Sequence, residues 1–317
     1  MCALMSKSAK ICIFMATYNG AKYISEQLKS IERQTIKDWE LVISDDGSTD
    51  DTLSVIQKFK KNHPLNSIQV IHGPRSGYAE NFLSMLRSYK GKGRYFAFSD
   101  QDDIWHENKI EKALNILEKV PDNLPGLYCS RTEYVDSFGK QYTPPRYSRE
   151  FVLRPNFENS LVQCLAGGNT MVFNACALKL VVSAILVSRV PSHDWWLYQL
   201  VTGCGGLVFY DPEPSLWYRQ HGQNLIGQNT KFGAKIKRIQ MFWTGKFAVS
   251  NRSNLSNLLC NNLLLSEDCR LSLKYYNQAC LNEKWYKRLC FLMKSRVKRQ
   301  NWLETVVLYI GVVFKKI

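Results

Sequence analysis

The sequence predicts an α/β protein whose core is a mostly parallel sheet, followed by a basic helical segment. Two observations support this prediction. Apolar strand candidates and amphipathic helical patterns alternate four times within the first 130 residues, as they do in parallel sheets with crossover helices. The net charge of +15 is also unevenly spread, because residues 231–317 hold 17 Lys and Arg against 4 Asp and Glu.

Each strand candidate is a short apolar run followed by a helical pattern. The four runs are residues 11–16, 39–44, 68–71 and 95–99. After the first run, Ile24, Leu28 and Ile31 recur at i, i+4 and i+7, which is the spacing of one helix face. After the second, an Asp-Gly-Ser-Thr sequence supplies turn and N-cap residues for the next helix. This succession predicts four parallel strands.

The second half of the chain is less regular. We expect strands over 126–135 and 161–173, and helices that begin near Ala175 and after Asp194. The composition turns basic beyond about residue 228, which marks a change of organisation. We therefore predict a main domain over residues 9–228, which divides into halves at 9–105 and 106–228. A basic, mostly helical segment over 229–317 follows it.

The composition limits the class of protein. With 317 residues, 45% of them hydrophobic, the chain can bury a large core, which excludes a disordered or collagen-like protein. The ten cysteines include no C-x-x-C pair, so reduced thiols in the cytoplasm are expected and a zinc site is not. No apolar signal segment precedes residue 11. The apolar stretch at 302–314 is too short to cross about 30 Å of hydrocarbon.

Polar loops follow all four predicted strands. These loops are residues 16–20, 44–50, 73–78 and 99–103, and they are rich in aspartate. Because the carboxyl ends of parallel strands meet at one edge of a sheet, we expect the loops to line a single ligand-binding crevice.

The aspartates at this edge indicate a divalent cation. Asp100 and Asp102 flank one residue, and such carboxylates suit an ion that keeps other positions for water and phosphates. An EF-hand, with Glu111 at its last position, is excluded because Trp105 stands where that loop needs glycine. Neither common glycine-rich phosphate loop occurs. A nucleoside diphosphate with Mg²⁺ or Mn²⁺ fits this pattern.

The motifs resemble those of glycosyltransferase family 2. They are Ala-Thr-Tyr-Asn-Gly at 16–20, Ser-Asp-Asp-Gly-Ser-Thr-Asp at 44–50 and Ser-Asp-Gln-Asp-Asp-Ile-Trp at 99–105. His-Asp-Trp-Trp at 193–196 and Tyr-Arg-Gln-His-Gly-Gln-Asn at 218–224 further resemble the family's rhamnosyltransferase-like branch. The resemblance implies the GT-A fold, a Rossmann-like nucleotide-diphospho-sugar transferase fold, with a nucleotide-binding half before residue 106 and an acceptor-binding half after it.

The resemblance also implies roles for single residues. The nucleotide-binding set would be Ala16, Thr17, Tyr18, Asp46, Gly77 and Asp100. Tyr18 would stack on a pyrimidine base and Asp46 would accept from its N3–H. Asp102 would bind the metal that bridges both phosphates, with His221 as a further candidate ligand. Asp194 would be the catalytic base that deprotonates the acceptor hydroxyl.

Each of these residues also has a purely structural interpretation. Tyr18 is a candidate core aromatic, and Asp46 or Asp194 is a candidate cap for the helix that follows it. Asp103 is a candidate helix N-terminal carboxylate. His221 is a candidate for a simple hydrogen bond to the backbone.

The function implied is inverting, metal-dependent transfer of one sugar onto a polysaccharide or lipid-linked glycan precursor, at the cytoplasmic face of the cell membrane. The branch resemblance favours L-rhamnose from dTDP-rhamnose over a UDP-hexose. The alternatives are a nucleotidyltransferase and a non-catalytic sugar-nucleotide-binding protein. The Gly-Gly-Asn sequence at 167–169 is a candidate for shaping the acceptor pocket, or a tight bend. Nucleic acid is not an expected partner, since no nucleic-acid-binding module accompanies the charge.

The basic tail contains a candidate membrane helix over 285–299. On a helical wheel, most of its apolar residues fall on one side and most of its Lys and Arg on the other. This is the pattern of a helix that lies in an anionic membrane surface. The alternative is a helix packed on the main body with a solvated basic face.

Overall fold

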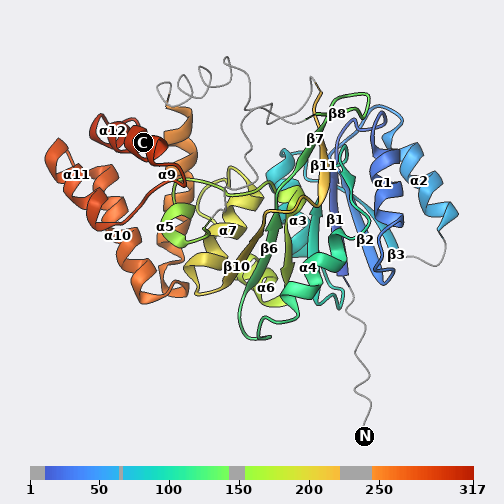
Figure 1. The fold of residues 1–317 in the computed structure, drawn as a ribbon, viewed down its shortest axis with the longest axis horizontal. Helices are drawn as coiled ribbons and strands as arrows, with labels where there is room; N and C mark the ends of the chain where they lie inside the picture. Colours follow the sequence, from blue (N-terminus) through green and yellow to red (C-terminus); the bar gives the residue numbers. More distant parts are fainter. Residues whose placement is uncertain (1–10, 64–66, 143–153, 222–244) are drawn as a thin grey trace, which may run out of the picture.

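The computed structural model describes residues 11–63, 67–142, 154–221 and 245–317. A seven-stranded sheet with the order β10-β6-β9-β4-β1-β2-β3 forms the centre (Figure 1). Its strands are β1 (Ile11–Thr17), β2 (Trp39–Asp45), β3 (Ser67–His72), β4 (Tyr95–Ser99), β6 (Gly126–Ser130), β9 (Val172–Asn174) and β10 (Leu207–Asp211). Only β9 runs against its neighbours, so the predicted mostly parallel sheet is confirmed.

The central strand is buried on both faces. Along β1, Ile11, Ile13 and Met15 belong to one hydrophobic cluster, and Cys12 and Phe14 belong to another. This alternation follows from the two-residue period of a strand, and a continuous apolar run is typical of parallel strands covered by helices on both sides.

Helices cover both faces of the sheet. The first cluster includes side chains of α1 (Ile24–Glu32), α2 (Thr52–Asn62) and α4 (Lys109–Leu117). The second includes side chains of α3 (Tyr78–Ser88), α6 (Ala175–Ser183) and α7 (His193–Gly203). The strand-helix units predicted for the first 130 residues are therefore present, in the predicted order.

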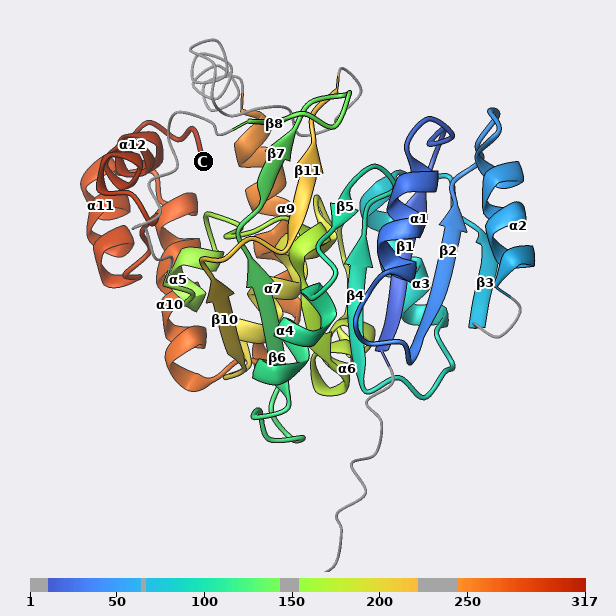
Figure 2. The same cartoon turned by 45° about the vertical axis from the view of Figure 1, so that its right-hand side comes forward.

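A smaller sheet lies beyond the carboxyl end of β4 (Figure 2). It has the order β5-β11-β7-β8, formed by β5 (Ile104–Trp105), β11 (Leu216–Arg219), β7 (Glu133–Val135) and β8 (Gln141–Tyr142). Because β5 follows the aspartates of the loop after β4, this sheet brings the chain near residue 219 back to them.

Two strand predictions in the second half were wrong. The expected strand 126–135 is divided, because β6 ends at Ser130 and β7 then joins the smaller sheet. Of the expected strand 161–173, only β9 is a strand. The preceding residues form a 3₁₀ turn, Gly168–Thr170, which packs against α7 instead of extending the sheet.

Four helices complete the described chain: α9 (Lys246–Cys260), α10 (Glu267–Leu281), α11 (Trp285–Lys294) and α12 (Trp302–Val313). They pack onto the sheet domain at α5 (Phe157–Ser160) and α7. Their side chains Leu258, Leu292 and Leu308 are buried in the same cluster that contains Phe14 of β1. Among the described residues, no helix is long and apolar enough to span a bilayer.

The candidate membrane helix differs from the prediction. It ends at Lys294, and Arg296 then adopts a left-handed conformation with φ of 58°. Leu292 and Val297, predicted for the lipid-facing side, are completely buried. Arg288, predicted for the solvated side, is buried and donates to backbone carbonyls, including that of Val313. The continuous amphipathic helix expected over 285–299 is therefore absent. The helix is interrupted by a turn after Lys294, and part of its predicted membrane-facing side is buried in the protein.

Candidate active site

Gln101 joins the loops that follow β1 and β4. Its Oε1 accepts from Thr17 Oγ1 at 2.6 Å and from the Tyr18 backbone N–H at 2.9 Å, and its Nε2 donates to the Tyr18 carbonyl at 2.9 Å. The amide thus fixes the segment predicted to hold the base, which begins at the half-buried Ala16. The Tyr18 ring is 56% exposed, so it is not a core aromatic and its face is open to a ligand. This role of Gln101 was not predicted from the sequence.

Asp46 fixes the loop that follows β3. Its carboxylate accepts from the backbone N–H groups of Arg75 at 2.6 Å and Gly77 at 3.2 Å. Asp46 is not the cap of α2, which begins at Thr52. Two of the predicted nucleotide-binding residues, Asp46 and Gly77, are therefore brought together. Each carboxylate oxygen has a second lone pair with which it can accept from a ligand.

The aspartates after β4 lie in a strongly acidic environment. Burial, together with the charges of Asp102 and Asp194, raises the pKa of Asp100 to about 7. Burial, together with the charges of Asp102 and Asp100, also raises the pKa of Asp103 well above its usual value. Asp103 lies before β5, whereas α4 begins only at Lys109, so it is not a helix N-terminal carboxylate. Its carboxylate accepts from Asn169 Nδ2 at 2.5 Å.

Lys109 brings a buried cation beside these carboxylates. Its side chain is completely buried, and Nζ donates to the Asn169 carbonyl at 2.6 Å while lying 4.5 Å from the centre of the Trp105 ring. Burial lowers the pKa of Lys109 to about 7, against the opposing charges of Asp103 and Asp100. Lys109 was not predicted as a site residue, although a lysine on the buried face of an amphipathic helix is a signal visible in the sequence.

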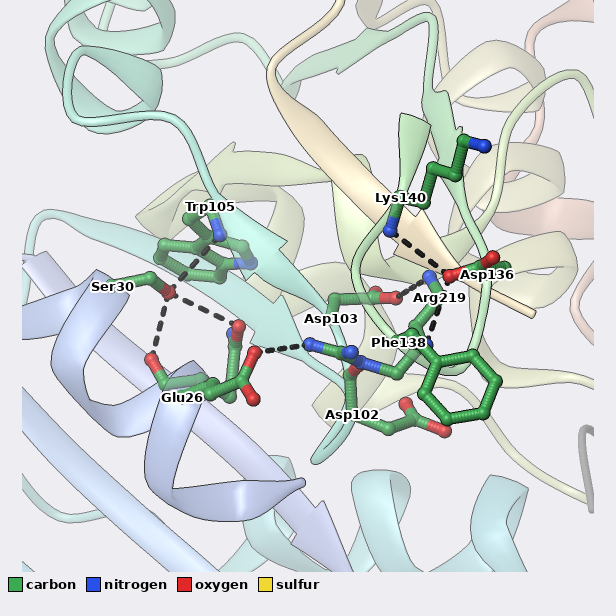
Figure 3. Close-up of polar contacts among 10 residues, drawn as sticks. Glu26, Ser30, Asp102, Asp103, Trp105, Asp136, Phe138, Lys140 and Arg219 are labelled. Atoms are coloured by element: carbon green, nitrogen blue, oxygen red, sulfur yellow. Dashed lines mark hydrogen bonds and ion pairs between the residues drawn. The ribbon is translucent and has the colours of Figure 1, made fainter. Parts of the chain in front are cut away.

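Arg219 fastens the end of β11 to the acidic loop (Figure 3). Its guanidinium pairs with the carboxylate of Glu26 on α1, and its Nε donates to the Asp102 carbonyl at 3.1 Å. The same guanidinium lies over the Tyr23 ring, 5.0 Å from its centre. The backbone beyond β11, which carries His221, is held beside Asp102 as a result.

Asp102 and His221 form the candidate metal centre. Asp102 Oδ2 and His221 Nε2 are 2.8 Å apart, and the imidazole stacks on the Tyr23 ring. Neighbouring ligands of an octahedral cation with bonds of about 2.1 Å are about 3 Å apart, so both atoms fit one Mg²⁺ or Mn²⁺. No group of three or more metal-binding side chains was found among the described residues. Water and phosphate oxygens would therefore supply the other positions.

Asp194 is held rigidly at the start of α7. Its carboxylate accepts from the Gly168 backbone N–H at 2.9 Å, from the Trp195 N–H at 2.7 Å and from the Ser192 hydroxyl. Ser192 occupies the N-cap position, so Asp194 is not the cap. A side chain at position 168 would come within 2.5 Å of His193 Nε2, so glycine is required there. Asn169, the next residue, then links Asp194 to the buried aspartates and Lys109.

His193 supports this arrangement from behind. Its ring stacks on Phe82 with centroids 4.0 Å apart and meets Phe98 edge-on. Burial lowers the pKa of His193 to about 4, although the charge of Asp194 opposes this shift. The imidazole is therefore neutral at physiological pH.

The buried imidazole predicts a pH-dependent stability. Between pH 6.5 and 4 the unfolded histidine binds a proton and the folded one does not, so stability falls as the pH is lowered. The variant His193→Phe lacks this effect. When the pH is lowered from 7 to 4.5, the free energy of unfolding of the wild type should therefore fall by about 2 to 3 kcal/mol more than that of His193→Phe. Urea denaturation at both pH values measures this difference, with His72→Phe at an exposed position as the control. Parallel pH dependence in the wild type and His193→Phe would refute the assignment.

Relatives of known class match most of the chain. A model described as glycosyl transferase family 2 matches residues 12–177. The dTDP-rhamnosyl transferase RfbG of Shigella flexneri is 32% identical over 233 residues, which are 71% of this chain and 78% of the relative. An uncharacterised glycosyltransferase of Rickettsia prowazekii is 30% identical over 245 residues, covering 75% of this chain and 71% of the relative.

Solved structures share the fold at low sequence identity. TarS 1–349 of S. aureus in complex with UDP matches with a TM-score of 0.57 and 14% identity, over 97% of this chain and 88% of that one. The mannosyltransferase PcManGT of Pyrobaculum calidifontis, in complex with GDP-Man and Mn²⁺, matches with a TM-score of 0.54 and 14% identity, over 96% and 86%. The expected GT-A fold is confirmed. The chain belongs to glycosyltransferase family 2 and is a glycosyltransferase.

Proposed function

We propose that this glycosyltransferase moves a single sugar from a nucleoside diphosphate to a glycan or lipid-linked acceptor, with inversion at the anomeric carbon. The observation that carries the proposal is the common site of three carboxylates. Asp100 experiences the charges of both Asp102, the candidate metal ligand, and Asp194, the candidate base. One site therefore holds groups suited to the leaving group and to the attacking hydroxyl.

The donor nucleotide would bind at the loops that follow β1, β2, β3 and β4. The exposed ring of Tyr18 offers a face for stacking on a pyrimidine, and Ala16 and Thr17 would form the adjoining wall. Asp46 would accept the N3–H of the base, beside Gly77, and Asp100 would lie near the ribose. Since uracil and thymine both present N3–H, this contact suits either base.

Asp102 and His221 would hold the cation that accompanies the diphosphate. A bound Mg²⁺ or Mn²⁺ would stabilise the charge on the departing diphosphate. The donors are an oxygen and an imidazole nitrogen, which suit Mn²⁺ as well as Mg²⁺. Binding there would separate Asp102 from its present hydrogen bond with His221, while Arg219 would keep the acidic loop in place.

Asp194 would act as the catalytic base. The acceptor hydroxyl transfers its proton to Asp194 while its oxygen bonds to the anomeric carbon and the bond to the diphosphate breaks. Such a displacement inverts the configuration, and a positioned base contributes about 10²- to 10⁴-fold in rate. The hydrogen bonds from Gly168, Trp195 and Ser192 orient the carboxylate before the acceptor arrives.

We propose dTDP-L-rhamnose as the donor, with a UDP-hexose as the alternative. The Shigella flexneri relative, a dTDP-rhamnosyl transferase, supports the first choice. The acceptor would be a precursor of a cell-surface polysaccharide, presented at the cytoplasmic side of the membrane. The site chemistry does not distinguish between these donor sugars, so a panel of nucleotide sugars with Mn²⁺ is the direct test.

Replacing Asp194 by Asn separates binding from chemistry. Donor affinity should stay within about threefold of wild type, while turnover should fall by about 10²- to 10⁴-fold because the base acts only during transfer. Isothermal titration with the nucleoside diphosphate and product release measure the two effects. Asp122→Asn, at an exposed position, is the matched control. NMR of the product should show inversion, and a retained configuration would disprove the mechanism.

Replacing Asp102 by Asn tests the metal centre. In the wild type, Mn²⁺ should strengthen nucleotide binding by about tenfold or more, and in Asp102→Asn the affinities with and without Mn²⁺ should converge. Far-UV circular dichroism should show an unchanged fold. Full transfer activity of the wild type in excess EDTA would contradict the proposal.

Lys109 is expected to be a positioning residue. Lys109→Met keeps the length of the side chain but removes the hydrogen bond to Asn169, and with it the support of the Gly168–Asp194 contact. The kcat should fall about 10- to 100-fold, as for other supporting partners of a site, with a much smaller change in donor KM. Lys119→Met, at an exposed position, is the control. Equal kcat values in wild type and Lys109→Met would show that the buried cation has only a structural role.

A further inference from the structure

The outer face of α12 is apolar and uncovered among the described residues. Six large side chains of α12 and its C-cap residue are exposed by 45 to 72%: Trp302, Leu303, Val306, Val307, Ile310 and Phe314. At 3.6 residues per turn they fall within an arc of about 140°. The opposite face contributes Leu308, Gly311 and Val312 to the interior. We call these six side chains the α12 outer face.

A face of this kind marks an interaction site. Isolated exposed apolar residues are ordinary on protein surfaces, but contiguous ones on a single helix face indicate a partner. A helix that is apolar all round normally lies in a protein interior or in lipid. The twelve residues of α12 extend over about 18 Å, so the helix can lie in a membrane interface but cannot cross the bilayer.

The charge around this face identifies the partner. Residues 284–317 contain nine Lys and Arg and a single acidic residue, Glu304. Exposed lysines at 287, 294 and 298 lie on α11 and the following turn, next to α12 in the fold. Positive charge beside an apolar helix face matches an anionic lipid surface. A second copy of the chain would bring two positive surfaces together, which disfavours self-association through this face.

The neighbouring helix adds residues typical of membrane interfaces. On α11, Trp285, Tyr286 and Met293 are more than half exposed. Tryptophan and tyrosine favour the headgroup region, where one end of the ring is in lipid and the other in water. In both views, α12 lies at the same end of the molecule as the carboxyl ends of β1, β2 and β4, where the candidate site is (Figure 1 and Figure 2).

We propose that the α12 outer face inserts into the headgroup region of an anionic membrane, with the lysines of α11 and the following turn at the lipid phosphates. This docking would place the site at the surface where a lipid-linked acceptor is presented. That consequence rests on the proposed function, whereas lipid binding itself does not.

The test uses the full chain and two double variants. Val306→Glu with Ile310→Glu places charge on the α12 outer face, and Leu263→Glu with Leu271→Glu places it on exposed apolar positions of η2 (Asn262–Leu264) and α10. All four positions are exposed, so both variants should fold. Deletion of 285–317 is unsuitable, because it would remove Leu292 and Leu308 from the interior.

Sedimentation with phosphatidylcholine vesicles, with and without phosphatidylglycerol, measures docking at physiological salt. Wild type and the control variant should bind the anionic vesicles, and the α12 variant should bind at least about tenfold more weakly. Transfer to a water-soluble acceptor should be the same in all three, and transfer to a lipid-linked acceptor should fall only in the α12 variant.

Two results would overturn the proposed docking. One is wild-type protein that does not bind anionic vesicles, or that binds them as well as the α12 variant does. The other is a wild-type dimer, detected by light scattering, that the α12 variant dissociates. Lipid binding as proposed, with no transfer from any nucleotide sugar, would instead reject the proposed function and leave the docking surface standing.

Discussion

The accumulation of carboxylates after β4 is the constraint on which the rest of the site depends. Asp100, Asp102 and Asp103 are close together, and burial together with the charge of Asp102 disfavours ionisation of Asp100 and Asp103. Two basic side chains lie beside this loop, one of them only six residues beyond Asp103. Lys109 approaches from within α4, and Arg219 arrives on β11. Arg219 donates to the backbone carbonyl of Asp102 and pairs with Glu26, so the smaller sheet ties the acidic loop to α1.

The site divides into a rigid part and an open part. Asp194 and the 3₁₀ turn beside it are buried and bound by several hydrogen bonds, so the group assigned to proton transfer loses little freedom on binding. Tyr18 lies on an exposed loop, where a ring can adapt to a base. Gln101 fixes the backbone of Tyr18 from within the acidic loop, while the Tyr18 ring itself stays exposed. The residue proposed for proton transfer, Asp194, is thus held rigidly, whereas the residue proposed for recognition of the base, Tyr18, is free to adjust.

The sequence predicted the first half of the fold well because its signals there are local. Apolar runs, turn residues and helix periods lie within a few positions of one another, and the carboxyl ends of the strands indicated where the candidate site lies. The sequence did not predict the division of residues 126–135 between two sheets, which depends on pairing with β11 far along the chain. The role of Gln101 was missed for the same reason, since its partners Thr17 and Tyr18 are brought close only by folding. The end of α11 at Lys294 likewise reflects packing, because Leu292 is buried in the main hydrophobic cluster and Arg288 donates to the carbonyl of Val313 on α12.

The hydrophobic cluster shared by Phe14, Leu258, Leu292 and Leu308 has a consequence for protein engineering. A tail joined only by a linker can be exchanged between homologues at the linker. Here the interface between the sheet domain and α9–α12 is part of the hydrophobic core. A chimera made at this interface would therefore bring together core side chains whose shapes do not match. Exchanging surface properties between such enzymes therefore calls for substitutions on the outside of the last helices, while the residues at their inner faces are kept.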